Sequence, residues 1–181
     1  MALDLPLETP RLILQKKSGQ DFNRFFLMSK DPEVWKYIGD GSIFHWSREA
    51  AIEKFDAPSF SMNAPDAFLV SVYRKDLSQY IGWCCVKFSK FLGGMDFDYR
   101  FLKDAWGNGF ATETGCRLIR EIFRKTDIRE ILACVHPENH RSLRVLEKLG
   151  FSYVRDVFSR PIEKSIRVYS LSRSMVEDGK N

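Results

Sequence analysis

The feature that most constrains the fold is a run of three apolar, strand-like segments between residues 67 and 102. The segments are 67–74, 80–89 and 95–102, separated only by KDLSQ and by a turn containing FLGG. Connections this short suit hairpins, so the three strands should pair antiparallel. A glycine-containing loop, a helical pattern over 109–125 and a buried strand at 128–135 come next. We therefore expect a mixed, largely antiparallel sheet.

Short helical patterns precede this run, and a helix and two strands follow it. The remaining segments are a strand at 11–16, helices starting after Ser18, at Pro32 and after Ser47, a loop at 57–65, a helix at 139–150, and strands at 151–158 and 165–173. This order predicts an α+β fold with helices packed on both faces of one mixed sheet. No linker or repeat divides the 181 residues, so we expect a single domain spanning 1–181.

The composition excludes several classes of protein. Apolar residues make up 44% of the chain and charged residues 29%, as in an ordinary soluble globular protein. A net charge of +4 is too mild for a nucleic-acid footprint, so we expect no direct nucleic-acid partner. No apolar stretch approaches the roughly 18 residues of a membrane span, and no signal-peptide pattern opens the chain. We expect no metal site, because the four cysteines lack metal-ligand spacing. We also expect a cytoplasmic protein whose cysteines are reduced.

The stretch AWGNGFATETG, residues 105–115, places two glycines directly before a helix. Unpaired N–H groups and the positive end of the helix dipole make such a helix start an anion site, and glycines let a diphosphate approach the backbone. A sharp turn without any ligand would also explain Gly107 and Gly109. The stretch matches neither a nucleoside-triphosphate loop, because no lysine follows, nor a dinucleotide fingerprint.

A second motif, directly after the next buried strand, favours the anion site. This motif is NHRSLRVLEKLGF (139–151). Together with WGNGFATE (106–113) and the opening ETPRLILQ (8–15), it resembles the GNAT superfamily of N-acetyltransferases, most closely the RimJ/RimL-like, ribosomal-protein-type branch. The three pieces occur in the order and spacing of that branch and span most of the chain. The resemblance implies acetyl-CoA-dependent transfer of an acetyl group to a primary amine, either a protein N-terminus or a small molecule.

The resemblance also implies where acetyl-CoA binds. The sheet should splay between its fourth and fifth strands, at 95–102 and 128–135, with the pantetheine arm in the cleft. The pyrophosphate should lie on the amides of Gly107 to Thr112. The implied cofactor-binding residues are Phe101, Leu102, Gly107, Asn108, Gly109, Phe110, Ala111, Thr112, Asn139 and Ser142. Trp106 departs from the Gln or Arg that is usual in the superfamily, although the branch tolerates Trp there.

Acetyl transfer requires that the amine loses a proton, the carbonyl oxygen is stabilised and the thiolate leaves. In the strand at 95–102, alternation puts Asp96, Asp98 and Arg100 on one face. Asp96 stands where the branch usually has Glu, so it is implied to be the catalytic base or the residue that positions a water. Asp98, beside Arg100, is a candidate substrate-binding residue for a cationic amine. Alternatively, both aspartates are simply solvated.

Ser142 is the second catalytic candidate, for stabilising or protonating the leaving thiolate. Many members of the superfamily carry a tyrosine acid on this helix where this chain has Leu146, and Ser142 lies one turn earlier. Ser142 and Asn139 could also act only as helix caps. The alternative acids that stay open are Tyr99, Tyr153 and Tyr169.

Trp35 and His45 lie in the segment that, by the resemblance, walls the acceptor pocket, and both are implied as substrate-binding residues. The identity of the amine stays open, and so does the oligomeric state, for which a homodimer is one option. The alternative function is a non-catalytic CoA-binding or sensory module of the same fold, because Asp96 replaces the usual glutamate.

Overall fold

The computed structural model describes residues 3–38, 45–56, 67–159 and 163–177. Within these residues eight strands form one sheet in the order β1-β2-β3-β4-β5-β6-β8-β7. The strands are β1 (Leu7–Glu8), β2 (Leu12–Gln15), β3 (Ala67–Arg74), β4 (Gln79–Ser89), β5 (Gly94–Phe101), β6 (Glu130–Val135), β7 (Ser152–Ser159) and β8 (Lys164–Ser172). In this described part of the chain β5 and β6 pair in parallel and the other neighbours pair antiparallel. The expected mixed, largely antiparallel sheet is confirmed.

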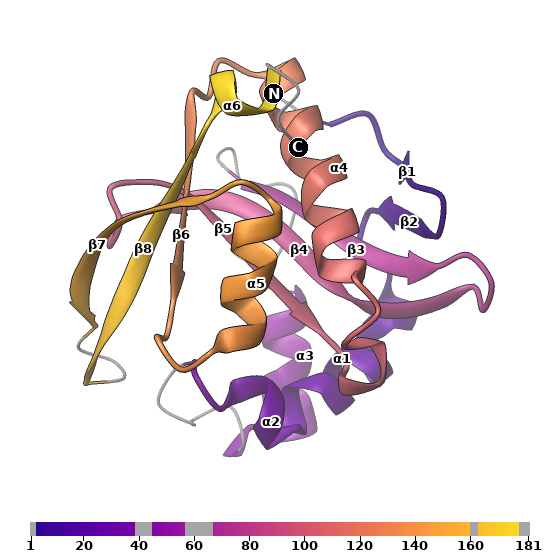
Figure 1. Cartoon of the computed structure of the whole chain (residues 1–181). Helices are drawn as coiled ribbons and strands as arrows, with labels where there is room; N and C mark the ends of the chain where they lie inside the picture. Colours follow the sequence, from indigo (N-terminus) through magenta and orange to yellow (C-terminus); the bar gives the residue numbers. More distant parts are fainter. Residues whose placement is uncertain (1–2, 39–44, 57–66, 160–162, 178–181) are drawn as a thin grey trace.

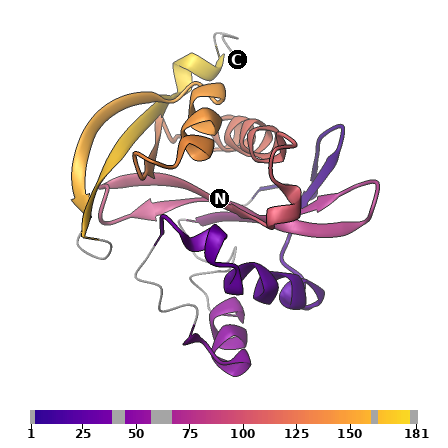
Figure 2. The ribbon, with the colours of Figure 1, turned by 60° about the horizontal axis from the view of Figure 1, so that its bottom comes forward.

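Helices cover both faces of this sheet, as expected (Figures 1 and 2). The helices are α1 (Phe22–Lys30), α2 (Pro32–Trp35), α3 (Arg48–Asp56), α4 (Phe110–Lys125), α5 (His140–Lys148) and α6 (Arg173–Glu177). Figure 2 shows α4 and α5 above the sheet and α1, α2 and α3 below it. The chain therefore forms three layers, with the sheet in the middle.

Each face of the sheet has its own core. On the α4–α5 side, Phe97 and Phe101 of β5 belong to the same buried cluster as Leu118 of α4. On the other side, a second buried cluster joins Phe25 of α1 to Trp83 of β4. Because side chains alternate along a strand, the odd-numbered residues of β5 face α4 and α5, and the even-numbered ones face α1 to α3.

The sheet parts between β5 and β6. Their recorded parallel register joins Asp96 to Leu132, whereas the ladder between β4 and β5 continues from Ser89–Gly94 to Gly82–Phe101. In Figure 1, β5 and β6 run apart, with α5 in front of them. The expected splay between the strands at 95–102 and 128–135 is therefore confirmed, and it begins beside Asp96.

The structure differs from the expected elements mainly at their ends. Sequence periodicity does not predict β1 or α6, because elements of two and five residues are too short to show it. The helix expected after Ser18 begins as a 3-10 turn, Gly19–Asp21, where Ser18 and Asp21 form a capping box, and α1 starts only at Phe22. The expected loop at 57–65 lies outside the described residues.

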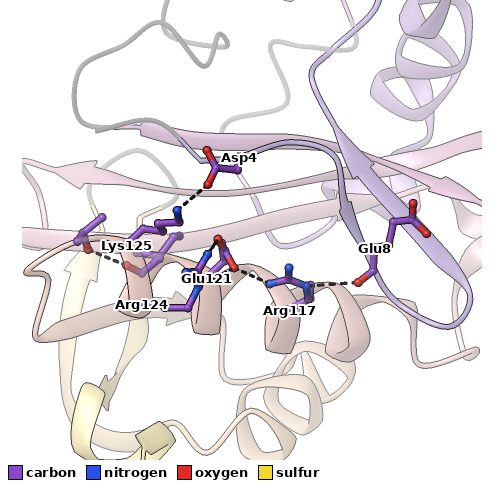
Figure 3. A network of polar contacts seen from close by, with 8 residues as sticks. Asp4, Glu8, Arg117, Glu121, Arg124 and Lys125 are labelled. Carbon is purple, nitrogen blue, oxygen red and sulfur yellow. Dashed lines mark hydrogen bonds and ion pairs between the residues drawn. The ribbon is translucent and has the colours of Figure 1, made fainter.

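A polar network ties the N-terminal segment to the outer side of α4 (Figure 3). The buried carboxylate of Glu121 accepts hydrogen bonds from Arg117, at 2.9 Å, and from Arg124. Lys125 Nζ lies 2.6 Å from an oxygen of Asp4. These cationic side chains of α4 therefore have local anionic partners.

Gly115 marks the place where α4 passes α5 and β5. A Cβ added there would lie 2.8 Å from Leu149 Cδ1 and 3.0 Å from Phe97 Cζ. Gly115→Val should therefore lower the free energy of unfolding by about 1–3 kcal/mol, measured by urea denaturation. Gly19→Ala is the matched control, because its added Cβ meets nothing within 4 Å. Equal urea midpoints for Gly115→Val and wild type would contradict this close packing.

Candidate active site

The loop between β5 and α4 has a backbone geometry that favours glycine. Gly107 and Gly109 both have a φ of 78°. A Cβ on Gly107 would meet nothing within 4 Å, and one on Gly109 would meet Arg11 Nη2 at 3.6 Å. The first helical hydrogen bond of α4 runs from Glu113 N to Gly109 O, so the amides of residues 110–112 have no acceptor inside the helix. The glycines make a turn, and the open space and unpaired helix amides are what an anion site requires.

Arg11, just before β2, holds this loop in place. Arg11 Nη1 donates a hydrogen bond to Asn108 O at 3.0 Å, and Arg11 Nε donates to Glu113 at 2.7 Å. The guanidinium also lies 4.8 Å from the centroid of the Phe110 ring. Sequence reasoning missed this role, because no local pattern connects residues so far apart in the chain.

Trp106 fastens the loop to β5 and α5. Its Nε1 donates to Phe101 O at 2.8 Å, and the Arg141 guanidinium of α5 lies 5.0 Å from the centroid of an indole ring. Asn108 Nδ2 donates to Trp106 O at 3.0 Å. The indole thus connects the loop to the end of β5 and to α5. These contacts give a structural reason for a tryptophan here in place of the usual Gln or Arg. Nearby, Leu102 N donates to Ile81 O at 2.9 Å, at the end of β5.

Asn139 and Ser142 lie at the start of α5. The Asn139 side chain accepts a hydrogen bond from Ser142 N at 3.2 Å, which confirms that Asn139 caps the helix. Ser142 Oγ lies 2.8 Å from Tyr99 Oη of β5. Of the three alternative tyrosines, Tyr99 is the one that contacts Ser142 within the described part of the chain. Tyr153 and Tyr169 pack on each other, with ring centroids 5.9 Å apart.

Asp96 lies where β5 and β6 begin to part. Its Oδ1 atom is buried and has no hydrogen-bond partner among the described residues. Burial raises the pKa of Asp96 to about 7, and repulsion from the Asp98 carboxylate contributes to the rise. Lys87 and Arg100 act in the opposite direction. A carboxylate with this pKa is suited to accept a proton near neutral pH.

Asp98 and Arg100 form an ion pair on the same side of β5 as Asp96. The Arg100 guanidinium lies 5.2 Å from a ring centroid of Trp35 and 5.3 Å from one of Trp83. The structure therefore brings the predicted residues Asp98 and Trp35 into one cluster, through Arg100. Arg100 Nε and Trp35 Nε1 are buried without hydrogen-bond partners in the described ranges.

The turn that follows α2 also contacts the segment after β6. Tyr37, after α2, stacks on His136, after β6, with centroids 5.2 Å apart, and His136 Nδ1 accepts a hydrogen bond from Glu138 N at 3.2 Å. Sequence reasoning did not predict this contact. His45 is exposed, just before α3, and its substrate-binding role stays a prediction.

Residues 3–38, 45–56, 67–159 and 163–177 contain no group of three His, Cys, Asp or Glu side chains placed to hold a metal ion. In the same ranges, no helix is both long and apolar enough to cross a membrane. All four cysteines are free thiols: Cys84 and Cys85 are buried, Cys116 is half-buried and Cys134 is exposed.

Comparison with known proteins identifies the family. Residues 11–152 match the model of the acetyltransferase (GNAT) domain, so the chain belongs to the GNAT acetyltransferase family and is an acyltransferase. The uncharacterized N-acetyltransferase p20 of Bacillus licheniformis is 30% identical to it over 172 residues, which cover 92% of this chain and 94% of the relative.

Solved structures share the fold over nearly the whole chain. Spermidine N-acetyltransferase from Vibrio cholerae, solved with CoA and spermine, has a TM-score of 0.76 at 14% identity, covering 93% of this chain and 99% of that one. RimL, the ribosomal L7/L12 α-N-protein acetyltransferase solved with CoA, has a TM-score of 0.78 at 11% identity, covering 93% and 98%. At such low identity these likenesses concern the fold alone.

The raised pKa of Asp96 predicts how stability depends on pH. Because the folded-state pKa of about 7 exceeds the unfolded value of about 4, the folded chain binds this proton more tightly. Its contribution to stability is fully present below pH 4 and is lost as the pH rises to 7. Asp96→Asn carries no such loss. The stability of Asp96→Asn relative to wild type should therefore increase by roughly 2–4 kcal/mol from pH 4 to pH 8.

Urea denaturation at several pH values measures this difference. Asp127→Asn, at an exposed position, is the control. A constant difference between Asp96→Asn and wild type from pH 4 to pH 8 would contradict the raised pKa.

Proposed function

We propose that this chain is an acetyl-CoA-dependent N-acetyltransferase of the RimJ/RimL-like type, which acetylates a primary amine by direct attack in a ternary complex. One observation carries the proposal. Of the four buried side-chain atoms without hydrogen-bond partners among the described residues, three belong to Asp96, Arg100 and Trp35. Buried polar groups in folded proteins are nearly always paired. Three unpaired groups on one side of β5, two donors and one acceptor, support a polar ligand there.

In this proposal the two substrates bind on opposite faces of β5. Asp96 faces the layer of α1 to α3, whereas Tyr99 contacts Ser142 on the α5 side. An acceptor amine would enter from the first side and acetyl-CoA from the second. Because β5 and β6 part, the amine and the thioester of acetyl-CoA could meet in the opening between these strands.

The residues around α4 and α5 fit acetyl-CoA. Its pyrophosphate would accept hydrogen bonds from the amides of Gly107 to Thr112, where the two glycines leave open space. The pantetheine arm would run between β5 and β6, past Phe101 and Leu102 and towards Asn139. The sulfur would then lie at Ser142.

Acetyl transfer forms one bond and breaks another. The amine nitrogen attacks the thioester carbonyl carbon, a C–N bond forms and the C–S bond breaks. Asp96, which is ionised above its pKa of about 7, takes the proton from the amine directly or through a water. The Ser142 hydroxyl donates a hydrogen bond to the departing thiolate. The products are the acetylated amine and CoA.

The acceptor is a primary amine, either of a small molecule or of a protein N-terminus. The two structures compared above are named for acceptors of both kinds, spermidine and a ribosomal protein. In our proposal Asp98, Trp35 and His45 contact the acceptor. The Asp98 carboxylate favours a cationic amine, although its ion pair with Arg100 offsets part of that charge.

Binding of acetyl-CoA is the first test. Isothermal titration calorimetry should detect binding by the wild type and a loss of at least tenfold in affinity for Gly109→Trp, because the indole would fill the space above the loop and strain a φ of 78°. Gly19→Ala serves as the control. Equal affinity of wild type and Gly109→Trp would contradict the pyrophosphate site.

Turnover is the second test, with CoA release measured against a panel of amines. The wild type should release CoA in the presence of an acceptor, with kcat/KM rising through pH 7 as Asp96 ionises. Asp96→Asn should lower kcat by about 10²–10⁴-fold and remove that part of the pH dependence. Ionisation of the acceptor itself affects both proteins equally, so their difference reports on Asp96.

Three outcomes would contradict these roles. Binding of acetyl-CoA without release for any amine would favour a non-catalytic binding module. An unchanged pH profile in Asp96→Asn would exclude Asp96 as the base. Asp98→Asn should raise KM for cationic amines and move the Asp96-dependent step to lower pH, because repulsion from Asp98 contributes to the raised pKa of Asp96. An unchanged KM for every amine would remove Asp98 from the acceptor site.

A further inference from the structure

The hydrogen bond between Tyr99 and Ser142 joins the middle of the sheet to the start of α5. The two hydroxyl oxygens are 2.8 Å apart, and either atom could be the donor. Tyr99 lies on β5 opposite Cys84 of β4, and Ser142 lies in the first turn of α5. The bond therefore spans the gap between strand and helix on the side proposed for acetyl-CoA.

Neighbouring side chains fix the position of the Tyr99 ring. The ring centroids of Phe97 and Phe101 lie 5.5 Å and 6.1 Å from that of Tyr99. Both phenylalanines are buried in the main core. The phenol oxygen is thus held by packed aromatic residues on a strand, which is a more rigid support than a loop.

The Tyr99 phenol keeps its proton over the working range of an enzyme. Burial raises the pKa of Tyr99 to about 12, although the hydrogen bond with Ser142 acts in the opposite direction. A neutral phenol can donate its hydrogen to the serine oxygen. Tyr99 is therefore still a donor at neutral and mildly alkaline pH, where Asp96 is ionised.

The direction of this bond determines where the Ser142 hydrogen points. A serine hydroxyl has one hydrogen to donate and can accept as well. The backbone N–H of Ser142 is already engaged with Asn139 Oδ1. If Ser142 Oγ accepts from Tyr99, its own hydrogen is free to point to another acceptor. If Ser142 instead donated to Tyr99, it would have no hydrogen for a thiolate.

We propose that Tyr99 is a positioning residue, which donates to Ser142 Oγ and so directs the serine hydrogen to the departing sulfur. The proposal rests on the function proposed above, because it assumes that Ser142 faces the thiolate. A hydroxyl that accepts one hydrogen bond also becomes a better donor, since hydrogen-bond chains polarise one another. Tyr99 does not touch the sulfur in this arrangement and acts only through Ser142.

The other residues considered for this step do not offer this function. Leu146, one turn further along α5, is 2% exposed and packs in the main core. Tyr153 and Tyr169 pack on each other on the last two strands. Among the side chains that the structure describes, Tyr99 is the phenol placed to orient Ser142.

A double-mutant cycle tests the proposal with three variants: Tyr99→Phe, Ser142→Ala and both together. Tyr99→Phe removes one oxygen and keeps the packed ring, so kcat should fall about 5–10-fold, the worth of one hydrogen bond. The KM for acetyl-CoA and its affinity in calorimetry should stay the same. Ser142→Ala should lower kcat at least as much. In the Ser142→Ala background, Tyr99→Phe should have no further effect, because Tyr99 acts only through the serine.

The cycle separates the failure of the new proposal from failure of the proposed function. Multiplicative losses in the double variant would show that Tyr99 acts independently, which overturns the positioning role. Full activity of Tyr99→Phe beside a slow Ser142→Ala would also overturn it, while leaving Ser142 in its proposed place. Full activity of Ser142→Ala would exclude the role of Ser142 and, with it, that of Tyr99.

Two controls identify a merely structural effect. Tyr153→Phe removes a phenol oxygen from an exposed tyrosine of β7 and should leave kcat unchanged. Thermal unfolding should give Tyr99→Phe a midpoint within a few degrees of wild type. If the kcat loss of Tyr99→Phe came with an equal loss of acetyl-CoA affinity, a disturbed cleft would explain it and the proposal would be wrong.

Discussion

The partial pairing of β5 with β6 is the constraint on which the candidate site depends. Two neighbouring strands normally satisfy each other's backbone groups along their whole length. Here the recorded pairing is Asp96 with Leu132, and beyond it β5 stays bonded to β4 while β6 stays bonded to β8. The sheet is thereby opened in its middle, while β5 and β6 each stay paired with their other neighbour. Residues from both faces of β5 can reach the same opening.

The electrostatics of the site follow from this position. A carboxylate where the strands part is surrounded by sheet and helices, so burial and its neighbour Asp98 raise the pKa of Asp96. Arg100, held between Trp35 and Trp83, balances Asp98 but leaves its own Nε unpaired. An uncompensated buried group lowers stability. An unpaired buried group of this kind is expected where a polar ligand binds and supplies the missing hydrogen bond. The unpaired Arg100 Nε is therefore consistent with the proposed acceptor site on this side of β5.

Much of this arrangement could be predicted from the sequence, because it depends on local patterns. Gly107 and Gly109 do adopt the left-handed backbone that a turn before a helix requires, and Asn139 does cap α5. Alternation in the segment at 95–102 placed Asp96 and Asp98 on one face, away from Tyr99. The order of hairpins and crossover helix predicted the mixed sheet. These features depend on residues close together in the chain.

The remaining features depend on contacts between distant residues and left no local signal. Arg11 contacts Glu113, and Arg141 lies over Trp106, only because the sheet and α5 bring them together. The bond from Tyr99 to Ser142 has the same origin. The stacking of Tyr37 on His136 could not be predicted either, because it joins the turn after α2 to the segment after β6.

A crystal structure of the protein with CoA would test the central claim most directly. The pyrophosphate should lie on the amides of Gly107 to Thr112, the pantetheine arm between β5 and β6, and the sulfur within hydrogen-bond reach of Ser142 Oγ. Tyr99 should then still contact Ser142 from the other side. A pyrophosphate bound away from this loop, or a sulfur on the Asp96 side of β5 with Ser142 out of reach, would contradict the account.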